Sequence, residues 1–203
     1  MRNPKLSSLV AVLSFSFLVG CSEPQLPSAQ AALVLELSRQ TTLDAAGAGL
    51  AGYFCRRVIC AGDDSQNNPV RGLLEFDLEA LPAGITGDRI AGATLRIYQG
   101  ESSTTYAQLQ NLMVEHIRVA NLLDTTAFGA PTLETASSDA PGEGYLEVDV
   151  SDALKSDLAQ GRPSAQFRLR FNKPTNHDDR SNLALFSAAD GYAPQLILHL
   201  RRP

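Results

Sequence analysis

The chain has 203 residues, of which 44% are hydrophobic and 19% charged, and its formal net charge is −5. This length fits one medium domain or two small ones, and the apolar fraction excludes wholesale disorder. The acidic balance and the lack of a basic run argue against nucleic acid as a partner. There are three cysteines and no tryptophan. An odd number of cysteines leaves at least one outside an intrachain disulfide.

Residues 1–20 have the pattern of an export signal. Arg2 and Lys5 precede a run from Leu9 to Gly20 that is apolar apart from two serines. About a dozen apolar residues are too few for a stable membrane-spanning helix, which needs roughly twenty, but they are typical of a signal peptide. The junction with Cys21 resembles the processing site of bacterial lipoproteins, which are cleaved before the cysteine and acylated on its thiol. We predict lipidation of Cys21; the alternative is an ordinary signal peptide that ends near a cysteine.

The residues after the cysteine predict a lipid-anchored tether. Ser22 at this position, in place of Asp, resembles the pattern of Gram-negative lipoproteins that are exported to the outer membrane. Residues 21–30 are mostly polar and contain two prolines, which favours a short extended leash. Loss of residues 1–20 leaves 15 basic residues against 22 acidic ones, a formal charge of −7. We therefore predict an outer-membrane protein that contacts the membrane through its N-terminal lipid.

The body, residues 31–203, is dominated by apolar residues with a period of two. This alternation predicts strands with one buried and one wet face, and many such strands separated by Gly, Pro and Asn turns predict an all-β antiparallel β-sandwich. One short helix is expected after Ser151, with Leu154 and Leu158 on one face and an end at Gly161. The segments 103–110 and 121–142 are expected to be loops. The alternating apolar sets are Leu33, Leu35 and Leu37; Leu74, Phe76 and Leu78; Ala93, Leu95 and Ile97; Ile117 and Val119; Leu146, Val148 and Val150; Phe167, Leu169 and Phe171; and Leu196, Leu198 and Leu200.

Several stretches of the body resemble one domain family. Arg71-Gly-Leu-Leu-Glu-Phe-Asp-Leu-Glu-Ala-Leu-Pro-Ala-Gly-Ile85 and Ile90-Ala-Gly-Ala-Thr-Leu-Arg-Ile-Tyr98 resemble the core of the DNRLRE-type domain, also described as carbohydrate-binding module family 96. Residues 41–44, 144–161 and 186–198 resemble its opening, its strand-then-helix segment and its close. The resemblance implies a jelly-roll-like sandwich on exported bacterial proteins that often bind polysaccharide, with alginate-type ligands for some members.

A sugar ring is usually recognised by stacking its C–H face on an exposed aromatic ring while its polar edges take hydrogen bonds. Because the chain has no tryptophan, such a surface has to come from Tyr53, Tyr98, Tyr106, Tyr145 or Tyr192.

Cys55 and Cys60 remain after Cys21 is assigned to the lipid. An oxidising envelope compartment favours a disulfide between them. On one straight strand the two would lie about 16 Å apart, whereas a disulfide needs Cα atoms within about 7 Å. Either residues 56–59 form a hairpin tip or the bond does not form. Zinc is a further alternative, but a single C-x4-C pair is a weak zinc pattern.

Asp63 and Asp64 begin an oxygen-rich loop that continues to residue 68. Such oxygens suit calcium, although the spacing is not that of an EF-hand. The alternative is a solvated turn. No other cofactor is expected. Because there is neither a G-x-S-x-G nor an H-E-x-x-H pattern, we expect a non-catalytic protein.

Arg96, Arg168 and Arg170 are expected on strand faces opposite the core, and Tyr98 shares the face of Arg96. If these strands are neighbours, the arginines make a positive stripe for an acidic polysaccharide. The alternative is that each arginine pairs with a carboxylate of an adjacent strand, from the set Glu75, Asp77, Glu147 and Asp149. His116 and His199 are expected on the surface.

The sequence thus predicts a cell-envelope lipoprotein that binds an acidic polysaccharide or another glycan. The alternative is a structural or protein-interaction module of the outer membrane. Exposed aromatic residues would favour the first function, and an exposed apolar patch or an open edge strand would favour the second.

Overall fold

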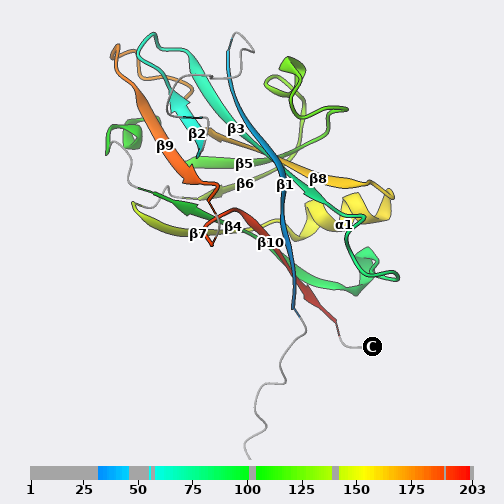
Figure 1. Cartoon of the computed structure of the whole chain (residues 1–203). Helices are drawn as coiled ribbons and strands as arrows, with labels where there is room; N and C mark the ends of the chain where they lie inside the picture. The colour runs from blue at the N-terminus through cyan, green and yellow to red at the C-terminus, as the bar shows by residue number, and fades with distance from the viewer. Residues whose placement is uncertain are drawn as a thin grey trace, which may run out of the picture.

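The computed structural model describes residues 32–45, 55, 58–100, 104–138, 142–189 and 191–201, so residues 1–30 lie outside the described part of the chain. This part consists of antiparallel strands with one α-helix and three short 3-10 helices (Figure 1). The predicted all-β antiparallel sandwich with one short helix is confirmed. The elements are β1 (Ala32–Asp44), β2 (Val58–Asp63), β3 (Pro69–Asp77), η1 (Gly87–Arg89), β4 (Ile90–Gln99), η2 (Thr104–Leu109), β5 (Leu112–Ile117), η3 (Thr125–Ala127), β6 (Thr132–Ser138), β7 (Gly144–Asp149), α1 (Ser151–Ala159), β8 (Ser164–Phe171), β9 (Asn182–Ser187) and β10 (Gln195–Leu200).

The strands form two layers. In one layer the order is β6, β5, β8 and β3, and in the other β7, β4 and β10. Strand β1 belongs to both layers, because its first half pairs with β10 and its second half pairs with β3, with a shift of register between Leu37 and Arg39. The β2–β9 pair also links the layers, since β2 pairs with β3 and β9 touches the end of β4. The sandwich is therefore barrel-like.

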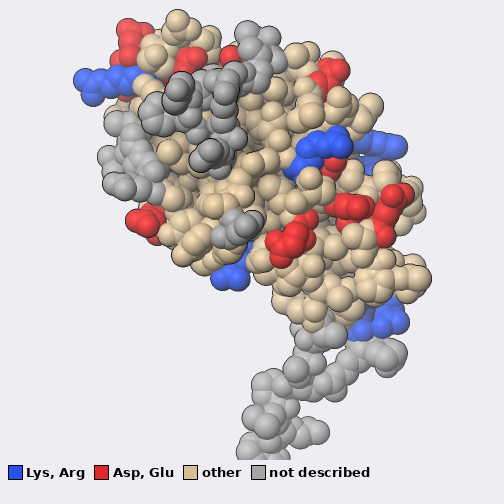
Figure 2. All heavy atoms as spheres, in the orientation of Figure 1, with Lys and Arg blue, Asp and Glu red and all other residues tan. Residues whose placement is uncertain are grey.

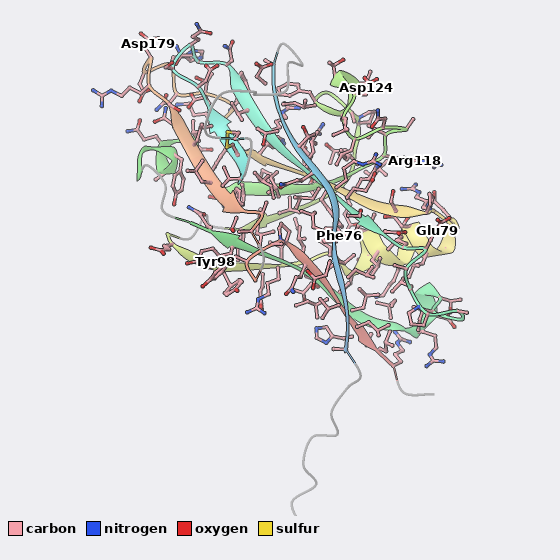
Figure 3. All side chains as sticks on the ribbon, viewed as in Figure 1. Phe76, Glu79, Tyr98, Arg118, Asp124 and Asp179 are labelled. Carbon is pink, nitrogen blue, oxygen red and sulfur yellow. A yellow bond between two sulfur atoms is a disulfide. The ribbon has the colours of Figure 1, made fainter. Side chains whose placement is uncertain are left out.

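The main core lies between the two layers. Alternate residues of the facing strands fill it, among them the fully buried Phe76, Phe167, Phe186 and Leu95. The rings of Phe76 and Phe167 meet edge to face with their centroids 6.2 Å apart. Phe76 is labelled near the centre of Figure 3. This is the arrangement that the period-two pattern predicts.

A second, smaller core lies on the outer face of the first layer. Residues 118–131 fold back over this face, and Leu122 packs there with Leu73 and Ile117. The covering segment corrects the prediction for β5, whose outward residues are not wet. His116, predicted on the surface, instead shares the core-facing side of β5 with Leu112 and Val114: it is 3% exposed and its ring lies 5.8 Å from that of Phe167. Ile117, predicted to face the main core, lies on the opposite side of β5, in the second core. The pattern of one strand does not reveal that a later segment covers its outer face.

The segment predicted as a loop over residues 121–142 contains η3 and the strand β6. Strand β6 pairs with β5 at the edge of its layer, and most of its residues are exposed on both faces. It has no apolar alternation because its residues are mostly exposed, and Ala136 alone among them packs against the main core. The sequence signal for a half-buried strand is therefore missing.

Helix α1 follows β7 and packs next to β4 and β8. Ser151 is its first residue, and the carboxylate of Asp149 accepts hydrogen bonds from the N–H and hydroxyl of Ser151. The Ser151 hydroxyl also accepts a 2.8 Å hydrogen bond from the N–H of Ala93 in β4. The helix ends just before Gly161, whose φ of 61° is the conformation that glycine adopts readily. Within the described residues, no helix is long and apolar enough to span a bilayer.

Candidate functional site

Three tyrosines lie together on the surface, and we call Tyr98, Tyr145 and Tyr192 the tyrosine cluster. The ring of Tyr98 lies 5.0 Å from that of Tyr145 and 4.6 Å from that of Tyr192, between ring centroids. Tyr145 and Tyr192 are nearly parallel, with an interplanar angle of 24° and centroids 6.4 Å apart. Their exposed fractions are 45% and 48%, which is high for aromatic side chains. The cluster is thus a surface group of three rings rather than part of the core.

Strand register brings these residues together. Tyr98 in β4 is the direct cross-strand partner of Tyr145 in β7, so both rings lie on the same face of the sheet. Tyr192 comes from the turn before β10, which is the other neighbour of β4. Figure 3 labels Tyr98 where β4 and β7 run side by side. The hydroxyl of Tyr145 donates a 3.3 Å hydrogen bond to the carbonyl oxygen of Gly191, which fixes the turn against β7.

Charged groups form the rim of the tyrosine cluster. The guanidinium of Arg96 lies over the ring of Tyr145, 4.0 Å from its centroid, and forms a 3.4 Å ion pair with Glu147. The hydroxyl of Tyr98 donates to Glu143 at 3.2 Å. Partial desolvation, the hydrogen bond to Glu143 and the charge of that carboxylate raise the pKa of Tyr98 above 10.0. Tyr98 therefore stays a neutral phenol at physiological pH, beside carboxylate and guanidinium groups that can bind hydroxyls.

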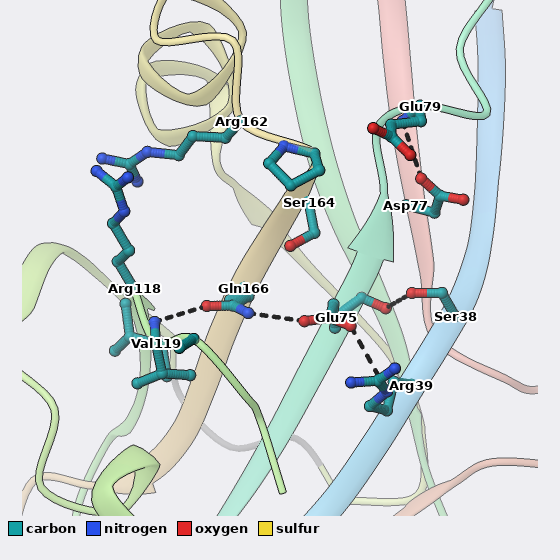
Figure 4. A pocket seen from close by; sticks show the side chains of 13 residues that line it. Ser38, Arg39, Glu75, Asp77, Glu79, Arg118, Val119, Arg162, Ser164 and Gln166 are labelled. Atoms are coloured by element: carbon teal, nitrogen blue, oxygen red, sulfur yellow. Dashed lines mark hydrogen bonds and ion pairs between the residues drawn. The ribbon is translucent and has the colours of Figure 1, made fainter. Parts of the chain in front are cut away.

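A groove of about 810 Å³ lies elsewhere on the molecule, across the outer ends of β1, β3 and β8 (Figure 4). Its floor is a chain of hydrogen bonds: Val119 N–H donates to Gln166, Gln166 donates to Glu75, and the Ser38 hydroxyl donates to the carbonyl oxygen of Glu75. Arg39 adds a 3.7 Å ion pair to Glu75. The groove is polar, and no aromatic side chain lines it.

The two ends of the groove differ in charge. At one end Arg118 and Arg162 extend toward one another (Figure 4). Arg162 is paired with Asp157 at 2.6 Å, whereas Arg118 is exposed and makes no ion pair in the described part of the chain. The other end carries Asp77 and Glu79. Figure 2 shows basic and acidic side chains close together on this part of the surface.

Two of the predicted ligand-binding arginines lie in an internal network. Glu115 is 2% exposed; its Oε2 accepts from Arg168 Nε at 2.7 Å and its Oε1 from Arg170 Nε at 2.7 Å. Arg168 also donates to the carbonyl oxygens of Phe128 and Ala130 at 2.8 and 2.9 Å. Burial raises the pKa of Glu115, but the hydrogen bonds and charges of both arginines outweigh burial and hold the pKa below 4.5. The network attaches residues 118–131 to the sheet.

The predicted stripe of Arg96, Arg168 and Arg170 is therefore not formed. Arg96 lies in β4, whose neighbours are β7, β9 and β10, while β8 carries the other two arginines between β3 and β5. Arg168 is 3% exposed because residues 118–131 cover it. As the alternative predicted, each of the three arginines forms an ion pair with a carboxylate of an adjacent strand. Arg96 pairs with Glu147, whereas Arg168 and Arg170 both pair with Glu115, which was not among the predicted partners.

Cys55 and Cys60 form a disulfide, with an S–S distance of 2.05 Å and Cα atoms 5.9 Å apart. The bond is possible because Cys55 precedes β2 instead of lying on the same straight strand as Cys60. The predicted pairing is confirmed, and it removes the zinc alternative for these two residues. Cys21, the predicted lipidation site, lies outside the described residues.

The predicted calcium loop is an ordered turn. Asp64 Oδ1 accepts from the N–H groups of Gln66 and Asn68, at 2.9 and 2.8 Å, and its Oδ2 accepts from the Asn68 amide. Asp63, in contrast, is fully buried and points away from this turn to the loop after β8, where the N–H of Asn176 donates to its Oδ2 at 3.2 Å. Among the described residues, no three His, Cys, Asp or Glu side chains converge in a metal-binding group.

Sequence reasoning missed a buried triad. Asp157 of α1 is fully buried; its Oδ2 lies 2.9 Å from His116 Nε2 and its Oδ1 2.6 Å from Arg162. The contact between His116 and Asp157 joins β5 to α1. In the sequence, Asp157 lies between Leu154 and Leu158 of the predicted helix and looks like an ordinary surface residue, so its burial could not be inferred from this pattern. His199, expected on the surface, is half-buried.

Comparisons of the chain with protein-family models and with curated proteins find no match. The resemblance to the DNRLRE-type domain thus stays a prediction from motifs, and the function has to be inferred from the surface itself.

Proposed function

We propose that this chain is a non-catalytic glycan-binding module of an outer-membrane lipoprotein. The observation that carries the proposal is the tyrosine cluster, because two exposed aromatic rings beside a half-buried third are a stacking platform for sugars. The signal-peptide pattern and Cys21 support the anchor. Lipidation would hold the body at the membrane through residues 21–30.

The geometry of the tyrosine cluster suits a ring-shaped ligand. Tyr145 and Tyr192 are nearly parallel and about half exposed. Arg96 lies over one face of Tyr145, so the exposed parts of the two rings that remain are what the C–H face of a pyranose can pack against. Glu143, Glu147 and Arg96 stand at the rim, where the hydroxyls of such a ring would lie. Carboxylates and guanidinium groups bind hydroxyls by charge-assisted hydrogen bonds, which supply orientation and specificity.

An acidic polysaccharide would have a second place to bind. The tyrosine cluster offers one guanidinium against two carboxylates, so it suits a neutral sugar unit better than an acidic one. The groove of Figure 4 offers the unpaired Arg118 beside Arg162, which is the arrangement that binds a carboxylate. An acidic glycan would therefore depend on Arg118 as well as on the tyrosines.

The experiment is a glycan array with the soluble body, residues 31–203, with and without calcium. The wild type is compared with the double variant Tyr145→Ala/Tyr192→Ala, with Arg118→Ala, and with Leu133→Ala as a control at an exposed position of β6. The proposal predicts glycan signals that the double tyrosine variant loses and the Leu133 variant keeps. A wild type that binds no neutral or acidic glycan would contradict it.

The alternative, a protein-interaction module, has one observation in its favour. Strand β6 is the last strand in its layer and pairs only with β5 among the described residues. Its outer edge therefore offers backbone hydrogen-bonding groups to another strand, and Leu133 on it is 52% exposed. This alternative would be supported if the chain bound no glycan on the array and an envelope protein could be cross-linked to it at β6.

A further inference from the structure

We propose that Asp63 and Asn182 bind a divalent cation of the calcium class at the end of the β2–β9 pair. The two residues are direct cross-strand partners, so their side chains lie next to each other on one face. Both are fully buried. Each also keeps one side-chain oxygen, Oδ1 in both cases, without a hydrogen-bond partner. Buried polar atoms are nearly always paired, so two such oxygens on adjacent residues point to a missing ligand.

Hydrogen bonds fix the direction of both free oxygens. The Asn182 amide nitrogen donates to the side chains of Asn176 and Asp178 at 3.2 and 3.0 Å and to the carbonyl oxygen of Arg180 at 3.2 Å. These three acceptors identify the nitrogen, so the amide oxygen has to lie on the other side. Asp63 Oδ2 accepts from the N–H of Asn176, which leaves Oδ1 free. Both side chains are thus held by Asn176 while their free oxygens remain available.

The charge of this region favours a cation over a water molecule. No cationic side chain among the described residues lies within ion-pair distance of Asp63, although its carboxylate is buried. Asp64, Asp178 and Asp179 belong to the same two loops, together with Arg180, and Figure 3 labels Asp179 at this end of the molecule, where Figure 2 shows acidic side chains beside a basic one. A bridging water would satisfy the two oxygens but would leave the buried charge uncompensated.

The donor chemistry selects calcium. Carboxylate and amide oxygens are hard ligands, and calcium accepts them in an irregular shell that water and backbone carbonyls complete. The proposed site has one carboxylate and one amide. It therefore differs from a group of three or more His, Cys, Asp or Glu side chains, none of which occurs among the described residues. The proposed site also differs from the pair predicted from the sequence, Asp63 and Asp64, because the carboxylate of Asp64 already accepts hydrogen bonds from the N–H groups of its own turn. The cation would join the β2–β3 turn to the loop before β9.

The test is thermal unfolding of the full chain in detergent, in EDTA, in 10 mM magnesium and in 10 mM calcium. Calcium sites of extracellular modules have dissociation constants of about 10⁻⁴–10⁻³ M, so calcium should raise the Tm by about 3–10 °C, and magnesium by less. Asp63→Asn should abolish this rise. Asp64→Asn, the matched control at the adjacent position, should lower the Tm but keep the calcium-dependent rise.

Isothermal titration of the wild type with calcium keeps the proposal testable if Asp63→Asn does not fold. One calcium bound per chain is expected. The absence of calcium binding, an unchanged Tm in calcium, or an equal rise in Asp63→Asn would overturn the proposal, and a buried water in this position would give the first two results.

Discussion

Glu115 is the residue whose replacement tests the packing of the molecule most sharply. Among the described residues it is the one carboxylate that pairs with Arg168 and Arg170, its charge also acts on Arg71, and it is 2% exposed. In Glu115→Gln the side chain keeps its shape but loses its charge, and its amide N–H₂ faces an arginine donor. Burial and the charge of Arg168 already lower the pKa of Arg71 to about 10, and the charge of Glu115 opposes that shift. The variant therefore leaves three buried or half-buried cations without an anion.

Removing one partner of a buried ion pair costs about 3–5 kcal/mol of folding free energy. For a domain of this size, that corresponds to a fall in Tm of about 6–20 °C. The assay is reversible thermal unfolding of the soluble body at pH 7, checked by urea denaturation. Glu147→Gln is the matched control, because Glu147 also pairs with an arginine but its side chain is 58% exposed, so its loss should cost less than about 1 kcal/mol.

The effect of Glu115→Gln also has a defined pH dependence. The folded protein holds the pKa of Glu115 below 4.5, so its contribution to stability is complete above about pH 4.5 and is lost as the pH falls through the folded pKa. The difference in Tm between wild type and Glu115→Gln should therefore be full at pH 7 and narrow below about pH 4.5. A Glu115→Gln loss no larger than that of Glu147→Gln, or a difference that stays constant down to pH 3, would refute the reasoning.

Three further predictions concern the disulfide, a glycine and the anchor. Cys55→Ser removes the disulfide to Cys60, which closes a short loop, so the free energy of unfolding should fall by about 2 kcal/mol and the Tm by about 4–8 °C. A reductant should lower the Tm of the wild type but leave the Tm of the variant unchanged. Gly62→Ala would place a Cβ 1.9 Å from a backbone oxygen of β9 and should cost about 3 kcal/mol in urea denaturation, whereas Gly129→Ala, where a Cβ meets nothing within 4 Å, should be nearly neutral. Cys21→Ala should abolish palmitate incorporation and release the chain from the outer-membrane fraction; continued sedimentation with membranes would argue against the lipid anchor.

The layered fold could be predicted from the sequence because period-two alternation reports which strand face is buried. Leu95 and Ile97 lie in the main core as this pattern indicates. The pattern fails for Arg168, since it assumes that the face opposite the core meets water, whereas the segment 118–131 covers that face. It fails for His116 because this polar residue faces the main core, where it contacts Phe167 and pairs with Asp157 of α1. The segment 118–131 and Asp157 both belong to parts of the chain that are distant in sequence.

The candidate site could be predicted only in part. Alternation places Tyr98 on the outer face of its strand, and the lack of tryptophan directs attention to the tyrosines. Their convergence depends on the register of β4 against β7 and on the turn that carries Tyr192, and neither can be read from a single sequence. The orphaned oxygens of Asp63 and Asn182 likewise appear only once the loops after β2 and β8 are placed side by side.

The central claim is that Tyr145 and Tyr192 bind sugar rings, and its most direct test is a calorimetric titration with the strongest glycan found on the array. Stacking predicts that Tyr145→Ala and Tyr192→Ala each raise the Kd by about tenfold, a loss of about 1.4 kcal/mol, because each removes one aromatic face. Tyr145→Phe keeps the face and loses only the hydroxyl contact to Gly191, so its Kd should stay within about twofold of the wild type. A glycan that binds the two alanine variants as tightly as the wild type would contradict the claim.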